Sequence, residues 1–216
     1  MLEIGLLKFG HVICLAYWLG TDLGVFYSSY FVADRELSAE TRLSMSRLLF
    51  ALDQGPRLCM PLILATGVHL AALQGWFALP PLALAAAWSV CLGWVAMVIV
   101  LHRRGPAAKA LTTFDYWFRV AAILGIGGVA GHALLNDAFA DWLAVKLLVF
   151  AALVASGLMI RRKLRPFGPA FAALAAGRAT DADDAAIRDS LASTRPFVVA
   201  IWAGLLVNTA LGIHLL

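Results

Sequence analysis

Six long apolar stretches alternate with shorter polar ones along the chain. Their bounds are 4–33, 44–73, 79–102, 114–135, 141–160 and 196–216. An α-helix needs roughly 20 apolar residues to cross the hydrocarbon core of a bilayer. The runs lack the alternation of membrane β-strands and are too long to be strands. The pattern therefore predicts an all-α fold, a polytopic membrane bundle of six transmembrane helices in a single domain, residues 1–216.

Two regions of the chain carry signals that modify this simple pattern. Pro56 and Pro61 lie inside the second stretch and predict a kink there. The connection 161–195 is the only sizeable segment outside the spans, and we expect it to form a hairpin on the cytoplasmic surface. Thr180 or Asp181 could cap a short helix in this hairpin. The last membrane helix is expected to begin at residue 196.

Composition and charge agree with a membrane protein and suggest its orientation. Hydrophobic residues make up 62% of the chain and charged residues 14%, whereas soluble domains average about half and a quarter. Arg and Lys gather in the first, third and fifth connections, so the positive-inside rule places these in the cytoplasm. Both termini then lie on the non-cytoplasmic side. We expect a multi-pass protein of a bacterial inner membrane. Its net charge of +4 then reflects its orientation in the bilayer and not the binding of nucleic acid.

Polar residues recur at one depth in five of the six predicted helices. Counting at about 1.5 Å per residue puts them all in the outer third of the bilayer. They are His11, His69, His132, His214 and Lys146. Polar groups inside a membrane are costly and usually functional. Several imidazoles at one level suit a haem or another metal, so the four histidines are candidate metal ligands.

Further candidates lie near this level or deeper. Trp18 and Asp22 share the helix face of His11. Gly128 belongs to a glycine-rich run before His132, which could pack against another helix or against a flat porphyrin.

Two arginines lie deeper in the predicted bundle. Arg57 and Arg119 each follow an aspartate, Asp53 or Asp115, by four residues. This spacing favours structural ion pairs along a helix. Arginine also suits carboxylates, so either side chain could instead receive a porphyrin propionate.

Several motifs resemble those of the HemJ-type protoporphyrinogen IX oxidases, which belong to a wider group that includes the copper-resistance CopD membrane proteins. The first helix carries Lys8-Phe9-Gly10-His11 and Tyr17-Trp18. The second carries Thr66-Gly67, the fifth Asp141-Trp142 followed by Lys146, and the last Arg195-Pro196. The family's Pro-Arg pair late in the first helix is replaced by Ser28-Ser29-Tyr30.

The resemblance implies that His11 and Lys146 serve haem binding and activity. The leading hypothesis is a membrane redox protein that holds haem b through one or two imidazoles, with His11 first and His69 or His132 as its partner. Lys146 and Asp22 are the candidate catalytic residues. The activity would be porphyrinogen oxidation or electron transfer to a quinone or a partner subunit. We expect a homo-oligomer or a subunit of a membrane complex.

Two other hypotheses stay open. His11 and Cys14 are three residues apart on one helix, and imidazole with thiolate suits copper, as in a CopD-like copper-handling protein. Alternatively, the chain is a non-catalytic membrane subunit of a larger complex, in which the common depth of the histidines is coincidental.

Overall fold

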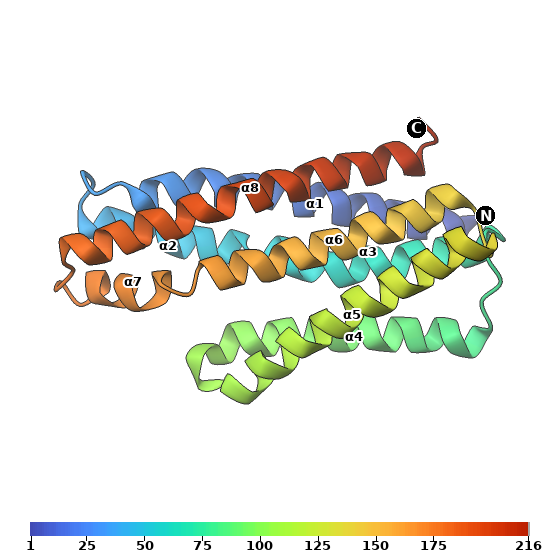
Figure 1. The fold of residues 1–216 in the computed structure, drawn as a ribbon, viewed down its shortest axis with the longest axis horizontal. Coiled ribbons are helices and arrows are strands. Elements are labelled where there is room, and N and C mark those ends of the chain that lie inside the picture. Colours follow the sequence, from blue (N-terminus) through green and yellow to red (C-terminus); the bar gives the residue numbers. More distant parts are fainter. Residues whose placement is uncertain (216) are drawn as a thin grey trace.

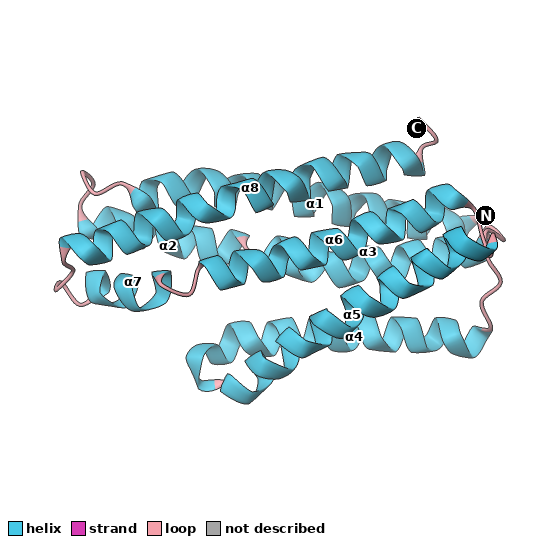
Figure 2. Cartoon of the chain, viewed as in Figure 1, coloured by secondary structure: helices cyan, strands magenta, loops and turns pink. Residues whose placement is uncertain are grey.

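The computed structural model describes residues 1–215, without the side chain of Pro106, and all of its regular elements are helices (Figure 2). In chain order they are α1 (Leu2–Ala33), α2 (Ala39–Leu52), α3 (Gln54–Leu73), α4 (Pro81–Arg104), the short η1 (Gly105–Ala107), α5 (Lys109–Asn136), α6 (Asp141–Lys163), α7 (Phe167–Ala175) and α8 (Asp181–Gly212). Six segments of these described residues, with α2 and α3 counted together, are long and apolar enough to cross a membrane. The predicted all-α membrane architecture is thereby confirmed. The last position of the predicted 196–216 stretch lies outside the described residues.

The helices form an elongated bundle whose two ends differ (Figure 1). The two chain termini lie at one end, which we call the terminal end, beside the α3–α4 and α5–α6 connections. The opposite end carries the α1–α2 connection, α7 and the start of α8. We call it the basic end, because most Arg and Lys residues of the connections belong to it.

The second predicted helix is interrupted rather than continuous. Helix α2 ends at Leu52 and α3 begins at Gln54, with Asp53 between them. Pro56 has no N–H to donate to the Leu52 carbonyl, so the helical ladder cannot pass through this point intact. Pro56 itself lies in the first turn of α3, where that N–H is not needed. Pro61 stays inside α3.

The last helix begins much earlier than the sequence predicts. Thr180 caps α8 through a reciprocal pair of hydrogen bonds with Asp183, which confirms the predicted cap. The helix it starts is not short, however, and continues without a break through Pro196. The prediction that the last helix begins at 196 was therefore wrong. Packing of the first half of α8 against α7 and α1 outweighs the one hydrogen bond that Pro196 removes.

Two apolar cores hold the bundle together. The larger lies between the membrane-spanning helices and includes Trp18, Met60, Trp94 and Phe150. The smaller lies at the basic end, where α1, α2, α7 and α8 meet around Val32, Leu49, Phe167, Ala170, Leu174, Ile187 and Leu191. The predicted surface hairpin is thus anchored by its own core, and its second arm is the first half of α8.

Candidate functional site

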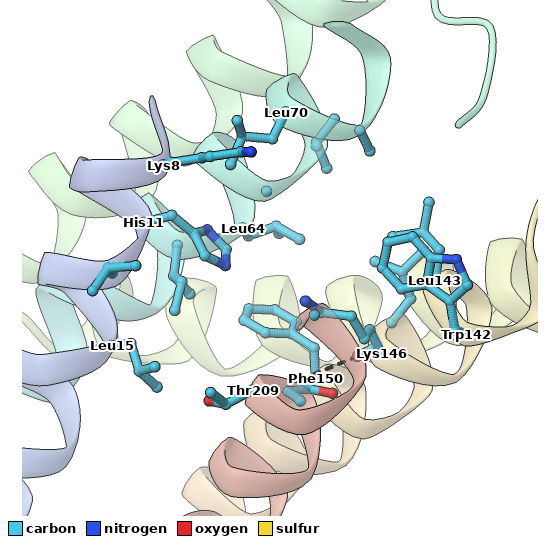
Figure 3. Close-up of a pocket in the computed structure, with 18 of the residues that line it drawn as sticks. Lys8, His11, Leu15, Leu64, Leu70, Trp142, Leu143, Lys146, Phe150 and Thr209 are labelled. Atoms are coloured by element: carbon cyan, nitrogen blue, oxygen red, sulfur yellow. Dashed lines mark hydrogen bonds between the residues drawn. The ribbon is translucent and has the colours of Figure 1, made fainter. Parts of the chain in front are cut away.

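A cavity of about 400 Å³ opens between α1, α3, α6 and α8 at the terminal end. Small-molecule sites typically measure about 300–1,000 Å³. Its walls are mainly aliphatic and aromatic, and its polar groups come from Lys8, His11, Gln74, Lys146, Asn208 and Thr209. Figure 3 shows His11 from α1 and Lys146 from α6 pointing into the same space. The two residues that the family resemblance singles out therefore line one cavity.

The hydrogen bonds of His11 decide which ring nitrogen faces the cavity. Nδ1 of His11 lies 3.0 Å from the hydroxyl oxygen of Thr66. That hydroxyl also lies 2.8 Å from the Leu62 carbonyl oxygen and 3.2 Å from the Ile63 carbonyl oxygen, and either can accept its only proton. When the Thr66 hydroxyl donates to one of these carbonyls, its oxygen accepts from His11, and in that tautomer Nδ1 carries the proton and Nε2 has a free lone pair. A neutral imidazole fixed through its far nitrogen is the form that binds metals.

A glycine gives the imidazole its space. A Cβ atom at Gly67 would lie 3.1 Å from Cε1 of His11, closer than ordinary van der Waals contact. A larger residue at this position would push the ring toward the cavity. The Thr66-Gly67 pair thus combines a hydrogen-bond acceptor with the room that the ring needs.

Lys146 has no carboxylate partner among the described residues. Its Nζ lies 5.8 Å from the centre of the Trp142 ring, a weak cation–π contact. A Cβ at Gly212 would lie only 2.6 Å from this Nζ, so α8 approaches the amine closely. A charged amine inside a membrane helix normally needs an anionic partner. Lys8 adds a second amine from α1.

The cavity has a cationic character because its described lining contains two lysines and an imidazole but no Asp or Glu. Asn208 adds an unused acceptor. Its Nδ2 donates to the backbone carbonyl of Lys146 at 3.3 Å, while its Oδ1 is buried with no partner among the described residues. A ligand that carries carboxylates and a hydrogen-bond donor would satisfy all of these groups.

Aromatic side chains form much of the remaining wall. Trp18, a predicted site residue, lines the cavity and meets Phe150 edge to face at 6.5 Å. Trp76 and Trp142 pack edge to face at 4.7 Å. The ring faces and edges suit a large planar ligand. Gly128 does not belong to this wall, since it is exposed on α5.

The other predicted histidines do not face this cavity. His69 lies in a separate groove beside Trp88 and Glu3. His132 is exposed on α5 and pairs with Asn136 of its own helix. His214 packs against the Trp142 ring at 4.9 Å. Within residues 1–215 no three His, Cys, Asp or Glu side chains lie close enough to share a metal ion. Sequence spacing gives the depth of a residue along its helix but not the neighbour that it faces.

The deeper polar residues form structural pairs. The predicted pairs Asp53–Arg57 and Asp115–Arg119 are both present. Asp115 is fully buried and also pairs with Arg161 of α6. These contacts occupy Arg57 and Arg119, and neither arginine lines the cavity, so the structure gives no support to a propionate role for them.

Asp22, a predicted catalytic residue, has a partner of a different kind. It is buried and accepts a hydrogen bond from Nε1 of Trp202 at 3.0 Å. It does not line the cavity either.

Two features of the site were missed by sequence reasoning. Thr66 belongs to the Thr66-Gly67 motif of the family resemblance, but the sequence gave no indication that it contacts His11. Asn208 is a lone amide in an otherwise apolar span, which is the signal that could have found it. Cys14 of α1 and Cys59 of α3 do not line the cavity, and both pack against the larger core.

Comparison with protein-family models, with curated proteins and with solved structures finds no match to this chain.

Proposed function

We propose that the cavity between α1, α3, α6 and α8 binds a haem b and that the chain is a membrane redox protein. The observation that carries this proposal is the state of His11. Its Nδ1 lies within hydrogen-bond distance of the Thr66 hydroxyl, and the tautomer with the proton on Nδ1 would leave Nε2 free toward a cavity of about 400 Å³. An imidazole prepared in this way is the usual axial ligand of haem iron. Bound haem would supply one-electron redox chemistry.

The cationic groups of the cavity favour a ligand with carboxylates. Lys146 and Lys8 would neutralise propionates. Trp18, Trp142 and Phe150 would cover the macrocycle and exclude water. The family resemblance of the sequence points to the same pair of residues, His11 and Lys146.

A single imidazole ligand is the form that the geometry supports. His11 is the only histidine among the described residues that line the cavity, and His69 and His132 face elsewhere. We therefore favour ligation by His11 alone over the His–His pair expected from sequence.

The decisive experiment is an absorption spectrum of the full chain purified in mild detergent from cells supplied with a haem precursor. We expect a Soret band that His11→Ala removes or strongly weakens, because the iron loses its protein ligand. The matched control is His102→Ala, which changes an exposed histidine at the end of α4 toward the basic end. A wild-type protein without a Soret band after haem reconstitution contradicts the proposal. Equal loss in both variants would indicate a folding defect instead.

The orientation and the partners belong to the same proposal. The basic end would face the cytoplasm of a bacterium, and the cavity would lie toward the opposite side of the inner membrane. The electron partner would be a porphyrinogen or a quinone, and the chain would work as a homo-oligomer or within a membrane complex. Alkaline phosphatase fused after residue 216 should be active and green fluorescent protein at the same place dark. Inactive alkaline phosphatase with fluorescent green fluorescent protein would indicate the opposite orientation.

A second candidate function is copper handling, and it is favoured by two free thiols, Cys14 of α1 and Cys59 of α3, that pack against the same core. Thiolates select Cu(I) among biological metals. His11 lies on the same helix as Cys14, as the sequence hypothesis requires, but the described residues hold no group of three ligands. Competition with a chromogenic Cu(I) chelator tests this function. Wild-type protein should hold one Cu(I) per chain, and the double variant Cys14→Ser, Cys59→Ser should lose it.

A further inference from the structure

A second hollow lies beside the first, on the other side of α1 and α3. It is an open groove of about 700 Å³ between the start of α1, α3 and α4. Its apolar walls come from Leu2, Leu6 and Leu7, and its polar residues are Glu3, Thr66, His69 and Trp88. The resemblance and the proposed haem site leave this groove without a role.

The hydrogen bonds of His69 fix its proton. Nε1 of Trp88 can only donate, and it lies 3.3 Å from Nδ1 of His69. In neutral His69 the remaining proton is therefore on Nε2. That nitrogen lies 3.5 Å from a carboxylate oxygen of Glu3, at the long limit of a hydrogen bond. The groove thus presents an N–H donor and a carboxylate acceptor side by side, and neither is fully used.

We infer that this groove binds the headgroup of a membrane quinone in its quinol form. A quinol oxygen can accept from the His69 N–H and donate its own proton to Glu3. The ester and phosphate oxygens of a phospholipid only accept, and a phosphate beside Glu3 would be repelled. The leucine walls and the Trp88 ring suit an apolar aromatic head that arrives from the lipid phase.

The position of the groove gives it a link to the proposed haem. Thr66 lines the groove, and its hydroxyl is the partner of His11 in the cavity. One side chain of α3 therefore lines the groove and contacts a residue of the cavity wall. The inference extends the proposed redox function and rests on it for the fate of the electrons, but quinol binding itself can be measured on haem-free protein.

The test is photolabelling of the full-length chain in phosphatidylcholine nanodiscs with a reduced azido-ubiquinol, followed by mass spectrometric mapping. We expect label on the first turns of α1 or on the segment from His69 to Trp88. Decylubiquinol should compete, and its affinity should fall about fivefold to tenfold in His69→Phe, because one hydrogen bond is lost. Glu3→Gln should weaken quinol binding more than quinone binding, since only quinol donates to the carboxylate. His132→Phe, a change at an exposed histidine of α5, should leave the affinity unchanged.

A second variant guards against a folding artefact. Leu6→Trp fills the groove without touching its polar groups and should also block labelling, while the thermal transition of the protein stays in place. Label on Trp142 or Leu147 in the cavity, equal affinity in His69→Phe and wild type, or displacement by phosphatidylethanolamine would each overturn the inference. Groove labelling in a protein that shows no Soret band would leave the inference standing and refute only the haem proposal.

Discussion

Lys146 and Arg119 are both cations inside helices that are apolar enough to span a membrane, but their surroundings differ. Arg119 lies nearer the basic end, hydrogen-bonded to the buried carboxylate of Asp115, with Arg161 on the other side of that carboxylate. Its guanidinium also lies 5.1 Å from the centre of the Trp94 ring. Lys146 faces a cavity that offers it aromatic rings and an amide but no described carboxylate.

Arg119 is a cation that stabilises the fold through an ion pair, whereas Lys146 is a cation that can bind a ligand. A buried charge with its partners in place is neutral for folding at best, but it becomes very costly when a partner is removed. A cation that faces an open cavity lacks such a partner within the fold and can bind an external anion. Substitutions at the two ends should therefore affect different measurements.

The largest effect on stability is expected for Asp115→Ala. Removal of this carboxylate leaves Arg119 and Arg161 facing each other without compensation, which costs about 3–5 kcal/mol of unfolding free energy. Equilibrium unfolding in mixed micelles measures it. The matched control is Asp189→Ala, which breaks only the exposed Arg188–Asp189 pair and should cost less than about 0.5 kcal/mol. Similar losses in both variants would remove the distinction drawn between the two kinds of ion pair.

Lys146→Met should show the opposite behaviour. We expect unfolding free energy to stay the same or rise slightly, because an unpaired charge leaves the interior. Haem affinity should fall by about tenfold to a hundredfold, the value of a charge-assisted hydrogen bond. Haem transfer to apomyoglobin measures this affinity. Lys146→Arg should restore it poorly, since a planar guanidinium differs in shape from an amine. A strong loss of stability in Lys146→Met would show that this lysine belongs to the structural group.

An intermediate effect is expected at Asp22. Trp202→Phe keeps an aromatic ring beside Phe26 but removes the N–H that the buried Asp22 accepts. The loss should cost about 1–2 kcal/mol in the unfolding experiment. Haem affinity should stay unchanged, because Asp22 does not line the cavity. If Trp202→Phe has normal stability and reduced haem binding, Asp22 contributes to the haem site.

The smallest effect is expected for His132→Ala. This side chain is exposed, and its hydrogen-bond partner is Asn136 of its own helix. Stability should change by less than about 0.5 kcal/mol. The Soret band should keep its position and intensity. A shift of that band would indicate that His132 ligates iron after all, through a rearranged α5.

The residues explain which parts of this picture could be predicted from sequence. Hydrophobic run length is a local property, so the six spans followed from it, and the pairs Asp53–Arg57 and Asp115–Arg119 followed from helical spacing. Thr180 was recognisable as a cap for the same reason.

The remaining features depend on contacts between helices. His11 and His69 were expected at one depth, but they face different hollows because the rotation of α1 and α3 about their axes depends on packing. The uninterrupted course of α8 through Pro196 likewise depends on neighbours, here α7 and α1. The role of Thr66 required the position of its hydroxyl proton, which depends on two carbonyls of α3.

Because α8 is uninterrupted, it connects the basic end of the molecule to the cavity at the terminal end. At about 1.5 Å per residue its 32 residues measure about 48 Å, well beyond the thickness of a hydrocarbon core. One arm is held near the basic end by the ion pair between Arg42 and Asp184, and the other supplies Asn208 and Thr209 to the cavity wall. Pro196 lies between the two arms, and the helix can bend there because proline donates no backbone hydrogen bond. A partner that pulled on the arm at the basic end would thereby change the width of the cavity at the terminal end.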